Sequence, residues 1–129
     1  MAIQKKGSNA ERELVHLFFD AGWMAMRAAG SGSIGLPCPD VIAGNGVRRV
    51  VIECKAIAAS VKYLTKKEVE ELLEFGRTFG AEPWIGIKFN NKGWRFLSCE
   101  DARQTEKSRV ISQKTAEIKG LTFKELIEE

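Results

Sequence analysis

Cysteine and histidine are scarce in this chain of 129 residues, which has three cysteines and a single histidine. The cysteines, Cys38, Cys54 and Cys99, form no CxxC pair, and this pattern argues against a zinc site. Their odd number also argues against a disulfide framework. We therefore expect reduced thiols, which suit a reducing compartment.

Long apolar runs are also missing. None approaches the roughly 20 residues that a membrane-spanning helix needs, and residues 1–6 lack the apolar stretch of a signal peptide. We expect a cytoplasmic protein with no membrane partner. Hydrophobic residues make up 44% of the chain and charged residues 29%. These fractions are typical of a globular protein, and the length suits a single domain, residues 1–129.

The sequence has no large excess of charge of one sign. Its net charge is +3, from 20 basic and 17 acidic residues, which alone is weak evidence for a nucleic-acid partner. Acidic residues dominate 68–74 and the C-terminus. Basic residues gather elsewhere, at Lys5, Lys6, Arg12, Arg27, Arg48, Arg49, Lys62, Lys66 and Lys67. One face of the molecule would then be basic, and the alternative is an ordinary solvated surface.

A capping box, Ser or Thr followed three residues later by Glu, occurs at 8–11, 65–68 and 122–125. Each predicts the start of a helix. The first helix is expected from Ser8 to about Ala21, the second to end before Gly80, and the third to be a short terminal helix. Four residues at helical spacing predict the buried stripe of the first helix, namely Leu14, Leu17, Phe18 and Ala21.

Strands are predicted at 23–28, 39–43, 47–55, 84–89 and 94–97. A two-residue type I′ turn at Asn45-Gly46 would place Asp40 opposite Val51 and diagonal to Glu53. Because side chains alternate along a strand, Asp40, Glu53 and Lys55 would share one face and Cys54 the other. The helix beginning at 65 would be a crossover packed between two halves of one sheet, so we expect an α/β fold with a mixed sheet of about five strands.

Two stretches give weaker signals. Residues 30–35 match G-x-G-x-x-G, but an extended segment containing Pro37 and Pro39 follows instead of a helix. A dinucleotide site is therefore rejected and a mobile loop is predicted. Residues 100–120 are polar and weakly patterned, and no element is predicted there.

The acids and the lysine on the shared sheet face form a hard-oxygen site next to a cation. Mg²⁺ suits Asp40 and Glu53 together with waters and a phosphate oxygen, and would activate water and neutralise phosphate charge. Lys55 would orient or deprotonate the attacking water, or stabilise the pentacovalent phosphate. The alternative is a simple Glu53–Lys55 salt bridge. Glu11 extends the buried stripe of the first helix, either as a cap or pointing towards this site.

Pro39-Asp40 followed by Glu53-Cys54-Lys55 resembles the Pro-Asp…(Asp/Glu)-x-Lys signature of restriction-endonuclease-like nucleases. The wider pattern resembles the archaeal Holliday junction resolvases over nearly the whole chain, in segments 6–14, 27–31, 39–46, 52–55 and 93–96. The resemblance implies a restriction-endonuclease-like fold. It also implies a Mg²⁺-dependent homodimeric endonuclease, with Mn²⁺ as a substitute, that makes symmetric paired nicks in four-way DNA junctions during recombination and repair.

The resemblance further implies roles for individual residues. The metal site would contain Glu11, Asp40 and Glu53. The catalytic set would add Lys55 and the loop serine Ser31. The DNA-binding residues would be Arg12 and Arg27, to which we add the basic pair Lys5 and Lys6. The dimer interface would contain Leu72, Phe75 and Phe79, for which ordinary core is the alternative.

Two other functions remain as alternatives. A module that binds branched or duplex DNA without cutting it is disfavoured, because acids clustered near phosphate repel the DNA backbone. A flap-cutting or restriction-type nuclease would use the same chemistry on another substrate. A clamp or repair protein is a candidate docking partner for the amphipathic residues 124–127, whose packing on the domain is the simpler interpretation.

Overall fold

The computed structural model describes residues 2–29, 35–57, 61–89, 93–104 and 110–128, with side chains described from residue 9 onward except at 57, 61–63, 102–104 and 110. The helices are α1 (Ala2–Asp20), α2 (Lys66–Phe79), α3 (Cys99–Gln104), α4 (Gln113–Lys119) and α5 (Phe123–Glu128). The strands are β1 (Met24–Arg27), β2 (Val41–Gly44), β3 (Arg49–Ile57), β4 (Val61–Tyr63), β5 (Glu82–Phe89), β6 (Trp94–Ser98) and β7 (Val110–Ser112).

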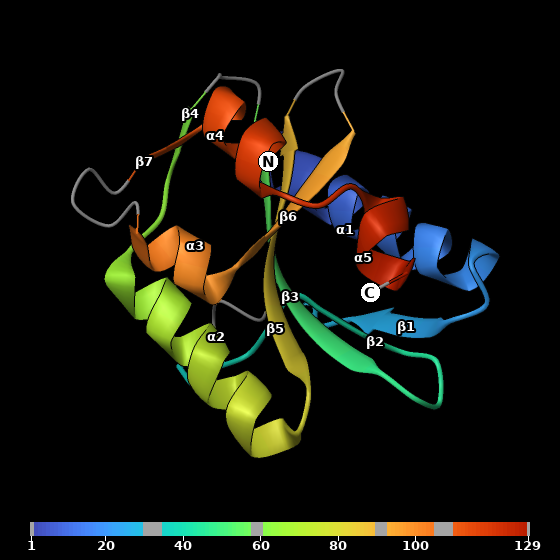
Figure 1. Ribbon diagram of the computed structural model, residues 1–129. Helices are drawn as coiled ribbons and strands as arrows, with labels where there is room; N and C mark the ends of the chain where they lie inside the picture. The colour runs from blue at the N-terminus through green and yellow to red at the C-terminus, as the bar shows by residue number, and fades with distance from the viewer. Residues whose placement is uncertain (1, 30–34, 58–60, 90–92, 105–109, 129) are drawn as a thin grey trace.

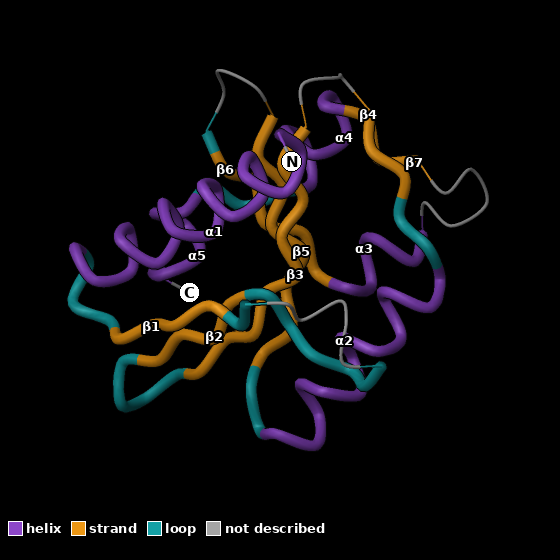
Figure 2. Tube along the Cα trace, turned by 180° about the vertical axis from the view of Figure 1, so that it is seen from behind, coloured by secondary structure: helices purple, strands orange, loops and turns teal. Residues whose placement is uncertain are grey.

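A five-stranded sheet with the order β1-β2-β3-β5-β6 forms the centre of the molecule. β3 and β5 run parallel, and the other neighbours are antiparallel. Helices α1 and α5 lie on one side of the sheet and α2 and α3 on the other (Figures 1 and 2). The expected mixed sheet flanked by helices is confirmed. The crossover helix α2, however, packs on one face and does not lie between two halves of the sheet.

Both faces of the central strand β3 are buried, as expected for a strand with a parallel neighbour. Val51 joins the core cluster under α2, whereas Val50 and Ile52 join the cluster under α1. On α1, the predicted stripe is confirmed at Leu14 and Phe18, both fully buried. Two further members differ, since Leu17 is half-buried and Ala21 exposed.

The start of α1 differs from the prediction. The helix begins at Ala2, so the segment 8–11 lies inside it and Ser8 is not its N-cap. Residues 2–6 are mostly good helix formers, and extending an existing helix costs far less than starting one. The other two capping boxes are confirmed. Thr65 Oγ1 and Thr122 Oγ1 each accept the backbone N–H three residues ahead at 3.1 Å.

The register of the β2–β3 hairpin is displaced from the prediction by two residues. Gly44 pairs with Arg49 instead of Val47, and the connection spans residues 45–48. The Asn45 side-chain oxygen accepts the backbone N–H groups of Val47 at 2.9 Å and Arg48 at 2.7 Å, which stabilises the longer turn. A displacement by two residues leaves every side chain on its predicted face.

Residues 99–119 contain three elements that the sequence pattern does not predict, α3, β7 and α4. β7 pairs with β4 in a separate two-stranded sheet. These elements have at most seven residues each, too few to produce a clear periodic pattern. Their formation depends on partners that are distant in sequence. No helix among the described residues is long and apolar enough to cross a membrane.

Candidate active site

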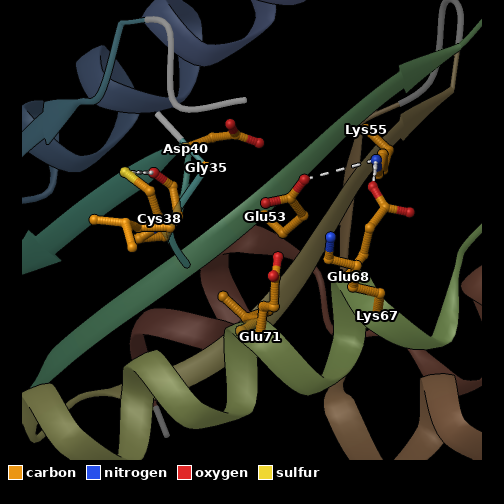
Figure 3. A pocket seen from close by; sticks show the side chains of 11 residues that line it. Gly35, Cys38, Asp40, Glu53, Lys55, Lys67, Glu68 and Glu71 are labelled. Carbon is orange, nitrogen blue, oxygen red and sulfur yellow. Dashed lines mark hydrogen bonds and ion pairs between the residues drawn. The ribbon is translucent and has the colours of Figure 1, made fainter. Parts of the chain in front are cut away.

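A pocket of about 420 Å³ opens where β3 meets the first two turns of α2 (Figure 3). Its lining combines acids and lysines with a few apolar residues: Gly35, Leu36, Cys38, Pro39, Asp40, Glu53, Lys55, Lys67, Glu68, Glu71 and Leu72. This pocket thus brings together the three candidate catalytic residues that were predicted on one face of the hairpin, Asp40, Glu53 and Lys55.

Asp40 precedes β2 and is fixed against β3 by main-chain hydrogen bonds. Its backbone N–H donates to the carbonyl of Ile52 at 3.0 Å, and its Oδ2 accepts the backbone N–H of Cys54 at 2.8 Å. The side chain of Cys54 packs on the cluster under α1, as alternation along the strand predicts. Its amide therefore orients the Asp40 carboxylate while its thiol stays out of the pocket.

The surroundings of Glu53 disfavour its ionised form. Burial raises the pKa of Glu53 to about 7, and the charges of Asp40 and Glu68 add to this effect. Lys55, whose Nζ lies 3.6 Å from Glu53 Oε2, compensates only in part. A cation bound beside Glu53 and Asp40 would favour the ionised form of Glu53.

Lys55 forms ion pairs with two carboxylates, Glu53 at 3.6 Å and Glu68 through a direct hydrogen bond. Burial pulls the pKa of Lys55 down, but the hydrogen bond and charge of Glu68, together with the charges of Glu53 and Asp40, raise it above its ordinary value. The side chain is therefore an ammonium at neutral pH.

The residues in the pocket fit a divalent cation only in part. Asp40 and Glu53 offer the hard oxygen ligands that Mg²⁺ prefers. Among the described residues, no three His, Cys, Asp or Glu side chains are close enough together to hold a metal ion. The chain would therefore supply two carboxylates, and waters or phosphate oxygens would fill the other positions.

Glu11 does not line the pocket. It lies on α1, on the other side of the sheet, and its Oε1 accepts a hydrogen bond from Arg27 Nε at 3.2 Å. Burial and the nearby charge of Asp40 raise the pKa of Glu11, while Arg27 acts in the opposite direction. Glu11 is thus an electrostatic neighbour of Asp40. Arg12 is exposed on the same helix.

Other predicted site residues are placed less completely. Ser31 and the side chains of Lys5 and Lys6 lie outside the described residues. In the expected interface, Leu72 is buried in the core of the chain itself. Phe75 packs against the same cluster and stacks on Phe79 with ring centroids 5.2 Å apart; Phe79 is 53% exposed.

Four pocket residues with ionisable side chains are absent from the sequence-based site prediction: Cys38, Lys67, Glu68 and Glu71. In the sequence, Glu68 is accounted for by its capping role alone. The i, i+3 spacing of Glu68 and Glu71 was an available signal, because it puts both carboxylates on one face of the helix. Only the packing of α2 against β3 turns that face towards the catalytic candidates.

Comparisons with known proteins agree on one family. The model of the family described as archaeal Holliday junction resolvase (Hjc) matches residues 2–129. The crossover junction endodeoxyribonuclease Hjc of Archaeoglobus fulgidus is 38% identical, covering 95% of this chain and 96% of that protein. The crossover junction endodeoxyribonuclease Hje of Saccharolobus solfataricus is 37% identical, covering 74% of this chain and 73% of that protein.

A solved structure agrees with the sequence relatives. It is described as the 1.6 Å structure of Archaeoglobus fulgidus Hjc, a Holliday junction resolvase from an archaeal hyperthermophile. It matches with a TM-score of 0.84 and 38% identity, covering 93% of this chain and 97% of that chain. The expected restriction-endonuclease-like fold is thereby confirmed.

Proposed function

The chain belongs to the archaeal Holliday junction resolvase family, and we propose that it cuts four-way DNA junctions by Mg²⁺-dependent phosphodiester hydrolysis, leaving symmetric paired nicks. Mn²⁺ would substitute for Mg²⁺. The observation that carries the proposal is the pocket in which Asp40, Glu53 and Lys55 meet. The same chemistry would serve recombination and repair.

Asp40 and Glu53 would hold the metal ion. When bound, Mg²⁺ supplies positive charge to the phosphate and lowers the pKa of the attacking water. The main-chain hydrogen bond from Cys54 fixes the direction of the Asp40 carboxylate. A bound cation would favour the ionised form of Glu53, whose pKa burial raises to about 7.

Lys55 would act as an ammonium. Its raised pKa supports electrostatic stabilisation of the pentacovalent phosphate and orientation of the attacking water over a role as a base. In this arrangement Asp40 and Glu53 are the two carboxylates of the pocket that would hold the metal ion, and Glu11, paired with Arg27, would join them only after a change of partner. Phosphate would compete with it for Arg27 and leave its carboxylate available beside Asp40.

DNA would be held mainly through its phosphates by Arg12 and Arg27, with Lys5 and Lys6 on α1, and Ser31 would assist cleavage. Contacts to phosphates carry no base information, so they would serve recognition of junction shape. A clamp or repair protein stays a candidate partner.

A homodimer would present two pockets to a junction with approximate two-fold symmetry. Exposed apolar side chains support an interface on the α2 side of the sheet. Phe79 is 53% exposed at the end of α2, and Met24 and Met26 on the edge strand β1 are 71% and 65% exposed. Because Ala25 packs towards α1, alternation puts these two methionines on the α2 side of the sheet.

The test compares a labelled four-way junction with linear duplex and flap substrates, in Mg²⁺ or in EDTA, for wild type, Asp40→Asn and Lys55→Ala. We expect paired nicks in the junction alone, lost in EDTA and reduced by at least about 100-fold in both variants while binding persists. Binding without cuts by the wild type would instead identify a junction-binding protein, and equal cutting of the flap would identify another substrate.

A further inference from the structure

Glu68 uses its two carboxylate oxygens for two different contacts. Oε1 accepts the backbone N–H of Thr65 at 3.0 Å and the Thr65 hydroxyl at 3.2 Å, which closes the capping box of α2. Oε2 accepts a hydrogen bond from Lys55 Nζ. One side chain therefore joins the start of α2 to the lysine in the pocket (Figure 3).

Capping alone does not account for this arrangement. Glu125 closes the capping box of α5 in the same way, accepting the backbone N–H of Thr122 at 2.9 Å, and it lies outside the pocket. Glu68 differs because it lines the pocket and its side chain is only 29% exposed. Its Oε2 accepts the hydrogen bond from Lys55 and takes no part in the capping box.

The contact with Glu68 restrains the flexible side chain of Lys55. The side chain of Lys55 is a flexible four-carbon stem that ends in a compact ammonium. Its ion pair with Glu53 is longer, with Nζ 3.6 Å from Oε2. Without Glu68, the ammonium would be drawn towards Glu53 and Asp40, the carboxylates between which the cation would bind.

We propose that Glu68 is a positioning residue for the cleavage reaction: it holds the Lys55 ammonium beside the two metal-binding carboxylates and keeps it from occupying the cation's place. Glu68 acts through Lys55 and not on the substrate itself. The inference rests on the proposed function, since it takes Lys55 as the catalytic lysine.

Glu68→Gln separates the two contacts. A glutamine at this position still completes a capping box, because its amide oxygen accepts the Thr65 N–H, but its NH₂ group then faces Lys55 and cannot accept from an ammonium. We expect the single-turnover rate of junction cleavage in saturating Mg²⁺ to fall by about 10- to 100-fold. The Kd for the junction, measured in EDTA, should not change.

Two controls isolate the effect. Thr65→Ala weakens the cap but retains the Glu68–Lys55 contact, so its Tm should fall while its cleavage rate stays near that of wild type. Glu125→Gln makes the same chemical change in the other capping box and should leave cleavage unaltered. A wild-type rate in Glu68→Gln, or an equal loss of rate in Glu68→Gln and Thr65→Ala, would overturn the inference.

Measuring Lys55→Ala in parallel distinguishes a failure of the proposed function from a failure of the positioning role of Glu68. If Lys55→Ala cleaves like wild type, the catalytic assignment of Lys55 is wrong and the role of Glu68 is wrong with it. If Lys55→Ala is inactive while Glu68→Gln is fully active, the proposed function stands and only the positioning role is rejected.

Discussion

At the scale of single residues, the folded protein surrounds Glu53 with an environment that disfavours its ionised carboxylate. Burial, reinforced by Asp40 and Glu68, raises the pKa of Glu53 to about 7, from an ordinary value of 4.5. In the unfolded chain the group would ionise at its ordinary pKa. The stability that protonated Glu53 contributes is therefore complete at low pH and is lost as the pH rises from about 4.5 to about 7.

Glu53→Gln should stabilise the metal-free protein at pH 8, because a neutral amide replaces a carboxylate that is costly to ionise. We expect a gain of up to about 3 kcal/mol in the free energy of unfolding, which shrinks towards zero as the pH falls to about 4.5. Urea denaturation at several pH values measures it. The same gain at every pH would contradict the explanation, and Mg²⁺ should stabilise the wild type but not the variant.

The sequence predicts which face of the sheet a side chain lies on wherever the two-residue alternation of a strand applies. Glu53 and Lys55 belong to one strand, so their common face follows from spacing alone. Asp40 joined them despite the wrong register, because an error of two residues preserves the face. Spacing places Glu11 only as an extension of the buried stripe of α1, and its pairing with Arg27 depends on how α1 lies across the sheet.

At the scale of elements, α2 links the pocket to the core. Its first turn supplies Glu68, and its last turns pack closely against the chain that follows. A methyl group at the buried Gly76 would lie 2.8 Å from the carbonyl oxygen of Ala81 and 3.2 Å from Pro83 Cβ. Because the backbone at Ala81 and Pro83 approaches the helix so closely, this position requires glycine despite the low helix propensity of glycine.

Gly76→Ala should destabilise the protein by about 1–2 kcal/mol, since the clash with Ala81 and Pro83 outweighs the better helix propensity of alanine. Thermal or urea unfolding measures the difference. Gly93→Ala is the matched control, because a methyl group there meets nothing within 4 Å in the described part of the chain. A neutral or stabilising Gly76→Ala would show that α2 moves to accommodate the methyl group.

At the scale of the whole molecule, the exposed apolar residues on the α2 side of the sheet support the proposed homodimer. Phe75 packs on the core, so truncating it would also cost stability, whereas Phe79 is 53% exposed and tests the interface more cleanly. Leu72 is unsuitable because it is buried within the chain.

Phe79→Glu should shift the protein from dimer to monomer at micromolar concentration, because it places a charge in an apolar interface. Sedimentation velocity measures the change. Ile118→Glu, at a side chain 72% exposed on α4, is the control and should leave the dimer intact. An unaltered dimer in Phe79→Glu would place the interface elsewhere, and a monomeric wild type would reject the dimer itself.

The sequence by itself determined what is local or periodic: the capping boxes of α2 and α5, the alternating faces of β3, and the family pattern that spans the chain. Tertiary structure alone decided the position of Glu68 in the pocket, the pairing of Glu11 with Arg27, and the pairing of β4 with β7. These contacts join residues on different elements. They depend on how helices and strands pack, and spacing within one element carries no record of that packing.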